Sequence, residues 1–164
     1  MKRLVAWSVV LASGLGLAAG LAAQMPKPEE VVEVRAEPMR LATKRGGTSG
    51  VTLFATVRAG FHINSNKPAE EYLIPTRVEL VEGVPFVLAD ARFPAGELKN
   101  FGFAPDDKLS VYQGTVKVPL KLRAQPDAPA GSHTLKLVFH YQACNDTICL
   151  RPARKEVTLT VRVE

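Results

Sequence analysis

The two cysteines of the chain, Cys144 and Cys149, are its candidates for thiol chemistry. The residues between them include Asn-Asp-Thr (145–147), types that favour a turn. Apolar and polar residues alternate along 134–141 and again along 157–163, as in strands buried on one face. The segment therefore predicts a β-hairpin with one cysteine on each arm. Opposed residues of antiparallel strands have Cα atoms about 4.5–5.5 Å apart, so a disulfide closing this hairpin is sterically reasonable.

Two roles for such a disulfide follow from its spacing. As a structural staple it contributes only about 2 kcal/mol through loop-closure entropy, because the ring is short. A staple would stabilise the protein more by joining distant strands. The other role is a reversible dithiol/disulfide pair that another protein's thiolate can reach. The spacing alone leaves both roles open.

The residues around the cysteines form a more specific pattern. Residues 141–144 read Tyr-Gln-Ala-Cys, and residues 149–152 read Cys-Leu-Arg-Pro. This resembles the N-terminal periplasmic domain of the thiol:disulfide interchange protein DsbD, where a strand ending Tyr-Gln-x-Cys leads through a short turn to a second Cys followed by prolines. The resemblance extends over roughly residues 31 to 163. Weaker matches lie at residues 60–64, 72–76 and 111–122.

The resemblance implies a function. In that family the second cysteine makes the mixed disulfide with partner proteins, which assigns attack to Cys149 and resolution to Cys144. The implied partners are thioredoxin-like periplasmic proteins and a membrane thiol reductase that supplies electrons. No cofactor is implied, and the activity would be that of a protein-disulfide reductase component. A different class of function stays open: a secreted immunoglobulin-like binding module whose disulfide only pins its last hairpin.

Residues 95–107 (AGELKNFGFAPDD) are the longest stretch without a strand pattern. They carry two aromatic residues, Phe101 and Phe103. One interpretation is that these rings fold back onto the edge of the sandwich. The other comes from the resemblance: a family loop at this place carries an aromatic residue and shields the cysteines until a partner displaces it. The chain has Glu97, Lys99 and Asn100 where the family often has more acidic side chains. An influence of acidic side chains on the reactivity of the cysteines is therefore unsupported.

The chain divides into three parts. Residues 1–23 have two basic residues, an apolar run and a small-residue ending, which predict a secretory signal peptide; an uncleaved membrane anchor is the alternative. Residues 24–30 are expected to form a flexible lead-in. Residues 31–164 have the size of one domain with its own core. Export, to the periplasm or outside the cell, would place the cysteines where disulfides persist.

The alternation of apolar and polar residues predicts a fold built from strands alone. Short alternating runs are separated by turn residues, and no helical stripe is present. The pattern predicts an all-β, immunoglobulin-like antiparallel β-sandwich that ends in the cysteine hairpin. Residues 44–50 are expected to form a turn. The expected strands before the hairpin are 32–36, 51–57, 61–64, 76–80, 86–89 and 116–122.

Other functional classes have less support. The net charge is +5, but the basic residues are spread along strand faces and form no block of the kind that binds nucleic acid. His140 with Cys149 lacks the paired spacing of a zinc module, so no metal is expected. His62 and Asn64 fall where the family domain carries tyrosines. We expect His62 to be a surface or hydrogen-bonded strand histidine.

Overall fold

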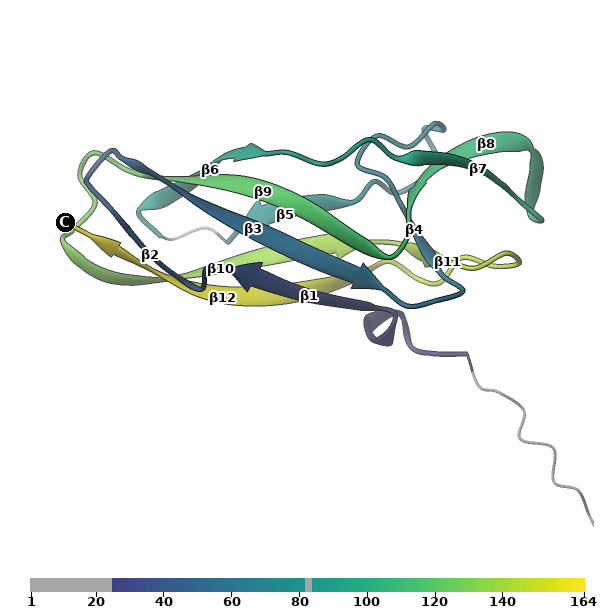
Figure 1. Cartoon of the computed structure of the whole chain (residues 1–164), viewed down its shortest axis with the longest axis horizontal. Helices are drawn as coiled ribbons and strands as arrows, with labels where there is room; N and C mark the ends of the chain where they lie inside the picture. Colours follow the sequence, from purple (N-terminus) through teal and green to yellow (C-terminus); the bar gives the residue numbers. More distant parts are fainter. Residues whose placement is uncertain (1–24, 82–83) are drawn as a thin grey trace, which may run out of the picture.

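The computed structural model describes residues 25–81 and 84–164 (Figure 1). The expected signal peptide, residues 1–23, lies outside these ranges. A single 3-10 turn, η1 (Pro28–Glu30), precedes the strands. The strands are β1 (Val32–Glu37), β2 (Arg40–Thr43), β3 (Thr48–Val57), β4 (His62–Asn64), β5 (Arg77–Leu80), β6 (Phe86–Ala91), β7 (Glu97–Phe101), β8 (Ala104–Tyr112), β9 (Thr115–Ala124), β10 (Gly131–Tyr141), β11 (Ala143–Cys144) and β12 (Ala153–Val163).

Two four-stranded sheets form the body of the molecule. Their strand orders are β1-β3-β9-β6 and β2-β12-β10-β5. All pairs within them are antiparallel except β2 with β12, which run parallel. The expected immunoglobulin-like antiparallel β-sandwich with its cysteine-bearing C-terminal hairpin is confirmed.

The core lies between these two sheets and follows the alternation in the sequence. Along β9 every second residue is buried, and along β10 and β12 the same period holds over most of each strand. These inward side chains are mostly Val and Leu, which suit a pleated and half-buried surface. Among the fully buried ones are Leu53, Leu120, Leu122, Leu135, Leu137 and Leu159.

A third sheet lies at one end of the sandwich, with the order β11-β4-β8-β7. Figure 1 shows its β7–β8 hairpin at the same end of the molecule as the cysteine hairpin, opposite the C-terminus. The expectation that residues 95–107 lack strand structure was wrong, because β7 and β8 pair across most of this stretch. Strand β8 also pairs with β4, which lies about 40 residues earlier in the chain.

Two smaller expectations also differ from the structure. Strand β2 was not expected, because its four residues form a short edge strand whose pairing is with the distant β12. The expected turn at 44–50 is shorter, since β3 begins at Thr48. In the part of the chain that the structure describes, no helix is long and apolar enough to cross a membrane.

Candidate functional site: the cysteine hairpin and the aromatic segment beside it

The cysteine hairpin is the extension of β10 and β12 beyond their last pair, Tyr141 with Ala153. Cys144 and Cys149 form a disulfide across an isolated antiparallel bridge, with their Cα atoms 3.9 Å apart. The turn between them is organised by Asn145. Its Oδ1 accepts hydrogen bonds from the Thr147 amide at 2.9 Å, the Thr147 hydroxyl at 3.0 Å and the Ile148 amide at 2.9 Å. This is the local side-chain to backbone bonding that makes Asn a turn residue.

Gln142 is the point at which the chain leaves the main sheet. Its side-chain amide donates to the Leu150 carbonyl at 3.1 Å. The amide of Asn64 in β4 donates to the Gln142 carbonyl at 3.4 Å, and the Asn64 side chain donates to Gln142 Oε1 at 3.4 Å. Beyond Gln142 the chain pairs with β4, where Ala143 lies opposite Ile63. The Tyr-Gln-x-Cys motif therefore positions the first cysteine on the third sheet.

The two cysteines differ in their access to solvent. Cys144 is 1% exposed, whereas Cys149 is an exposed residue. By the parity of β10, Cys144 should share the outward direction of Lys136 and His140. The structure differs because the hairpin changes its pairing at Gln142 and turns Cys144 inward. An incoming thiolate therefore has its access to this disulfide at Cys149.

His62 is the direct cross-strand partner of Cys144, in the antiparallel pair of β4 with β11. Side chains at such positions share one face of the sheet, with Cβ atoms about 4.5–5.5 Å apart. The alternative of a surface position for His62 was wrong. The residue is 1% exposed, and its Nε2 atom is buried with no hydrogen-bond partner among the residues that the structure describes. No local pattern predicts this burial, because the residues that cover His62 lie about 40 positions further along the chain.

Residues 101–103, which we call the aromatic segment, form that cover. The Phe101 ring stacks on the His62 ring with centroids 3.8 Å apart and 19° between the planes. Phe103 stacks on Phe101 at 5.7 Å. Between them, a Cβ atom on Gly102 would lie 3.1 Å from the carbonyl oxygen of Asp146, so the segment touches the backbone of the cysteine turn.

The two phenylalanines have different surroundings. Phe101 is 7% exposed and belongs to a small cluster of its own with Leu73, Leu109 and Val111, separate from the main core. Phe103 is 38% exposed. The stack is therefore held by Phe101, and Phe103 forms its outer layer.

The charges around His62 act against each other. Burial lowers the pKa of His62 from 6.5 to about 4; the nearby Asp146 carboxylate raises it, and the Lys99 ammonium lowers it. Lys99 in turn forms an ion pair with Glu97 at 3.0 Å. His62 is therefore uncharged at neutral pH.

The other side chains considered from the sequence lie apart from this arrangement. His140 Nε2 lies 2.8 Å from a carboxylate oxygen of Glu79 on β5. Across residues 25–81 and 84–164, no group of three His, Cys, Asp or Glu side chains is placed to hold a metal ion.

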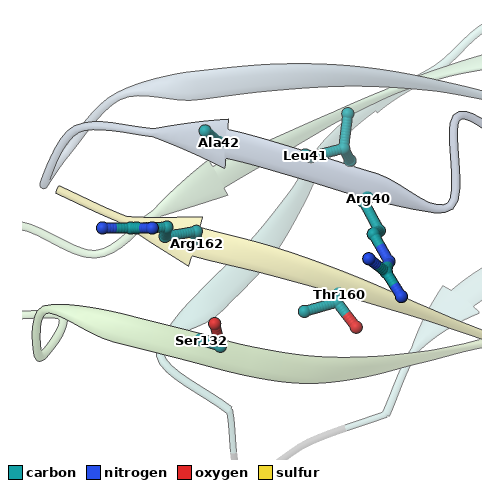
Figure 2. A pocket seen from close by; sticks show the side chains of 6 residues that line it. All are labelled: Arg40, Leu41, Ala42, Ser132, Thr160 and Arg162. Carbon is teal, nitrogen blue, oxygen red and sulfur yellow. The ribbon is translucent and has the colours of Figure 1, made fainter.

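A shallow pocket lies on the outer face of the other end of the sandwich, where β2, β12 and β10 run side by side (Figure 2). Its basic residues are Arg40 and Arg162. Figure 2 shows that their side chains extend in different directions, so the two guanidinium groups do not converge on one point. The pocket belongs to a different part of the surface from the cysteine hairpin.

Comparison with known proteins supports the family resemblance that the motif around the cysteines indicated. Residues 22–161 match the family described as thiol:disulfide interchange protein DsbD, N-terminal. The chain belongs to this family. Within this DsbD N-terminal-type domain, Cys144 and Cys149 form the disulfide of the C-terminal hairpin.

One solved structure shows the same fold at low sequence identity. The N-terminal periplasmic domain of ScsB from Proteus mirabilis matches with a TM-score of 0.56 and 14% identity. The match covers 82% of this chain and 49% of that one, so the chain spans about half of its length. A family 123 glycoside hydrolase from Clostridium perfringens matches with a TM-score of 0.40 and 7% identity, over 82% of this chain and 28% of that one. This likeness is too weak to indicate a shared fold or function. No curated protein matches the sequence.

Proposed function

We propose that this protein is a periplasmic thiol–disulfide exchange module that passes reducing equivalents to partner proteins through Cys144 and Cys149. In the reduced protein the Cys149 thiolate attacks a partner's disulfide, which forms a mixed disulfide and releases one partner thiolate. Cys144 then attacks the sulfur of Cys149 and releases the second partner sulfur as a thiolate. The partner gains two electrons, and the Cys144–Cys149 bond forms.

The difference in exposure between the two cysteines is the observation that carries this proposal. The exposed Cys149 suits a residue that meets a partner's sulfur, and the buried Cys144 suits one that reacts only within the molecule. A purely structural disulfide needs no such difference. The bond also joins neighbouring arms of one hairpin, where its contribution to stability is small.

The surface beside Cys149 suits a protein partner. Ile148, within the turn, is 47% exposed, and Phe103 in the aromatic segment is 38% exposed. Exposed apolar side chains beside a reactive group are typical of contact sites. The family suggests thioredoxin-like proteins as partners and a separate membrane thiol reductase as the electron donor. The expected export signal at residues 1–23 fits a periplasmic location.

The aromatic segment is the second part of the proposal. Phe101 and Phe103 act as a cap that a docking partner displaces, which protects the disulfide from small thiols in the absence of a partner. Gly102 supports this role, because its backbone lies against the cysteine turn. A cap at this place would make exchange depend on the surface of the partner.

The first test is the reduction potential of the Cys144–Cys149 couple, measured in glutathione redox buffers. We expect a midpoint above about −250 mV, among the exchange proteins. A midpoint below about −300 mV with slow exchange would identify a structural bond and favour the secreted binding module instead.

The second test separates the roles of the two cysteines. Cys144→Ser leaves the exposed thiol, and Cys149→Ser leaves the buried one. Each variant is mixed with a thioredoxin-like protein in its disulfide form, and mixed disulfides are counted on non-reducing gels. We expect Cys144→Ser to accumulate the adduct and Cys149→Ser to form little. Equal trapping by both variants would contradict the assigned order.

A further inference from the structure

The imidazole of His62 has no role in the exchange steps described above. It lies opposite Cys144 on the neighbouring strand, and both residues are 1% exposed. The stack with Phe101 fixes the orientation of the ring. Asn64, two residues along β4, binds Gln142 through backbone and side chain, so the strand is fixed against the cysteine hairpin on the other side as well.

The Nε2 atom of His62 is the informative detail. A buried polar atom without a partner lowers stability and is rare, so each one asks for an explanation. In the oxidised protein Cys144 has no proton to donate, because its sulfur is bonded to Cys149. Reduction of that bond creates an S–H donor on the residue directly opposite His62.

We propose that His62 Nε2 accepts the hydrogen bond of the Cys144 thiol in the reduced protein and takes up its proton when Cys144 resolves a mixed disulfide. This inference rests on the proposed function and adds a catalytic residue to it. In the resolving step the Cys144 S–H bond breaks and its proton passes to Nε2. The sulfur then attacks Cys149, and the partner's sulfur leaves with the bonding electrons. The proton on His62 is released to water or to that thiolate, so the charge balances.

Such help is needed at Cys144 more than at Cys149. A buried thiol resists ionisation, because desolvation disfavours the thiolate. The exposed Cys149 can lose its proton to water. A neighbouring imidazole makes the buried thiol easier to deprotonate, because the developing thiolate stabilises the imidazolium beside it.

The groups that face His62 have opposing effects on its strength as a base. Asp146 in the cysteine turn favours the protonated ring, whereas Lys99 on β7 opposes it and is itself paired with Glu97. Burial is the largest influence, and it lowers the pKa of the ring to about 4. The stacked Phe101 is part of that burial. Displacement of the aromatic segment by a partner would admit water and make His62 a stronger base at the moment of exchange.

The test uses the whole chain, reduced and then mixed with the small aromatic disulfide dithiobis(nitrobenzoate). Attack by Cys149 releases the first coloured thiolate, and resolution by Cys144 releases the second. We expect His62→Gln to slow the second phase by about 100-fold and to leave the first phase within about twofold, as for loss of a general base. His133→Gln is the matched control and should change neither phase, because His133 pairs with Val161 near the C-terminal end of β12, away from the cysteine hairpin.

The pH dependence separates proton transfer from a merely structural role. In the variant the rate of the second phase should rise tenfold per pH unit up to the pKa of the thiol, because only the free thiolate reacts. In the unaltered protein the dependence should be much shallower. A variant that slows both phases equally, or keeps the pH profile of the unaltered protein, would overturn the proposal.

A spectroscopic measurement needs no kinetic variant. The ring nitrogens of His62 are followed by NMR in the oxidised and reduced protein, and we expect the Nε2 resonance to shift on reduction as it gains the thiol. An unchanged resonance would also overturn the proposal. Neither the kinetic test with the probe disulfide nor the NMR measurement uses a protein partner, so both results are independent of whether the module exchanges with thioredoxin-like proteins.

Discussion

Replacement of Phe101 by leucine tests whether the aromatic segment controls access to the disulfide. Leucine keeps apolar contact with Leu73, Leu109 and Val111 but loses the stack on His62. An aromatic pair contributes about 0.5–1.5 kcal/mol beyond its buried area. If the segment opens before the disulfide reacts, the open fraction should rise about 2- to 13-fold, since 1.36 kcal/mol corresponds to a factor of ten.

The assay is the rate at which glutathione reduces the Cys144–Cys149 bond, at a concentration where the reaction is first order in protein. Phe86→Leu is the matched control. Phe86 is also buried, at 4% exposed, and its ring also contacts a histidine, His133, with centroids 5.7 Å apart. That pair lies away from the cysteine hairpin. Phe86→Leu should therefore alter the free energy of unfolding without altering the rate at which the disulfide is reduced.

Two results would refute this reasoning. If Phe101→Leu changes the rate less than twofold, the stack does not limit access to the disulfide. If Phe86→Leu accelerates reduction equally, the effect reflects general loss of stability. Phe103→Leu should have the smaller effect of the two cap residues, because Phe103 forms the exposed outer layer.

Three further predictions concern the same end of the molecule. Gly102→Ala should accelerate reduction by glutathione, because its Cβ would press on the Asp146 carbonyl at 3.1 Å; Gly50→Ala, whose Cβ meets nothing closer than 3.9 Å, should leave the rate unchanged. The unfolded chain takes up a proton on His62 near pH 6.5 and the folded protein near pH 4. The free energy of unfolding should therefore fall as the pH is lowered through that window, by at most about 3 kcal/mol in urea titrations, and His62→Gln should remove this part of the fall. Asn145→Ala should lower the free energy of unfolding by about 1–3 kcal/mol and accelerate reduction, because three hydrogen bonds of the turn are lost, whereas Asn145→Asp should retain them.

Each of these has a contrary outcome. Equal rates of reduction for Gly102→Ala and Gly50→Ala would mean that the aromatic segment accommodates the added methyl group without opening more often. A stability profile that His62→Gln leaves unchanged would place the acid sensitivity on other groups. Similar behaviour of the Ala and Asp variants at position 145 would show that the disulfide alone holds the turn.

The sandwich could be predicted from the sequence because its strands carry their own pattern. The alternation along 134–141 and 157–163 depends on local spacing, and it predicted the β10–β12 pair that carries the cysteines. The turn between them was readable for the same reason, since Asn145 bonds to residues two and three positions away.

The site itself depends on contacts that no local pattern contains. The burial of Cys144 follows from a change of partner at Gln142, from β12 to β4. The burial of His62 follows from stacking with a residue on another hairpin. Both depend on the third sheet, whose strands come from three separate places in the chain: β4, the β7–β8 hairpin and β11. The resemblance to the DsbD family located the cysteines and the aromatic residues, but it did not extend to His62, where this chain departs from the family's tyrosines.

The irregularity in the β7–β8 hairpin restricts how the aromatic segment can move. The regular pairing of the two strands ends at Lys99 and Leu109, and a shifted bridge from Phe101 to Ala104 closes the tip. The regular part is continuous through β8 and β4 with the strand that bears Cys144. Beyond the shift the tip lacks this regular pairing, so we expect it to move more easily than the rest of the sheet. A partner would therefore lift a small hinged tip and leave the sheet that holds the buried cysteine undisturbed, which allows docking and release without remodelling the domain.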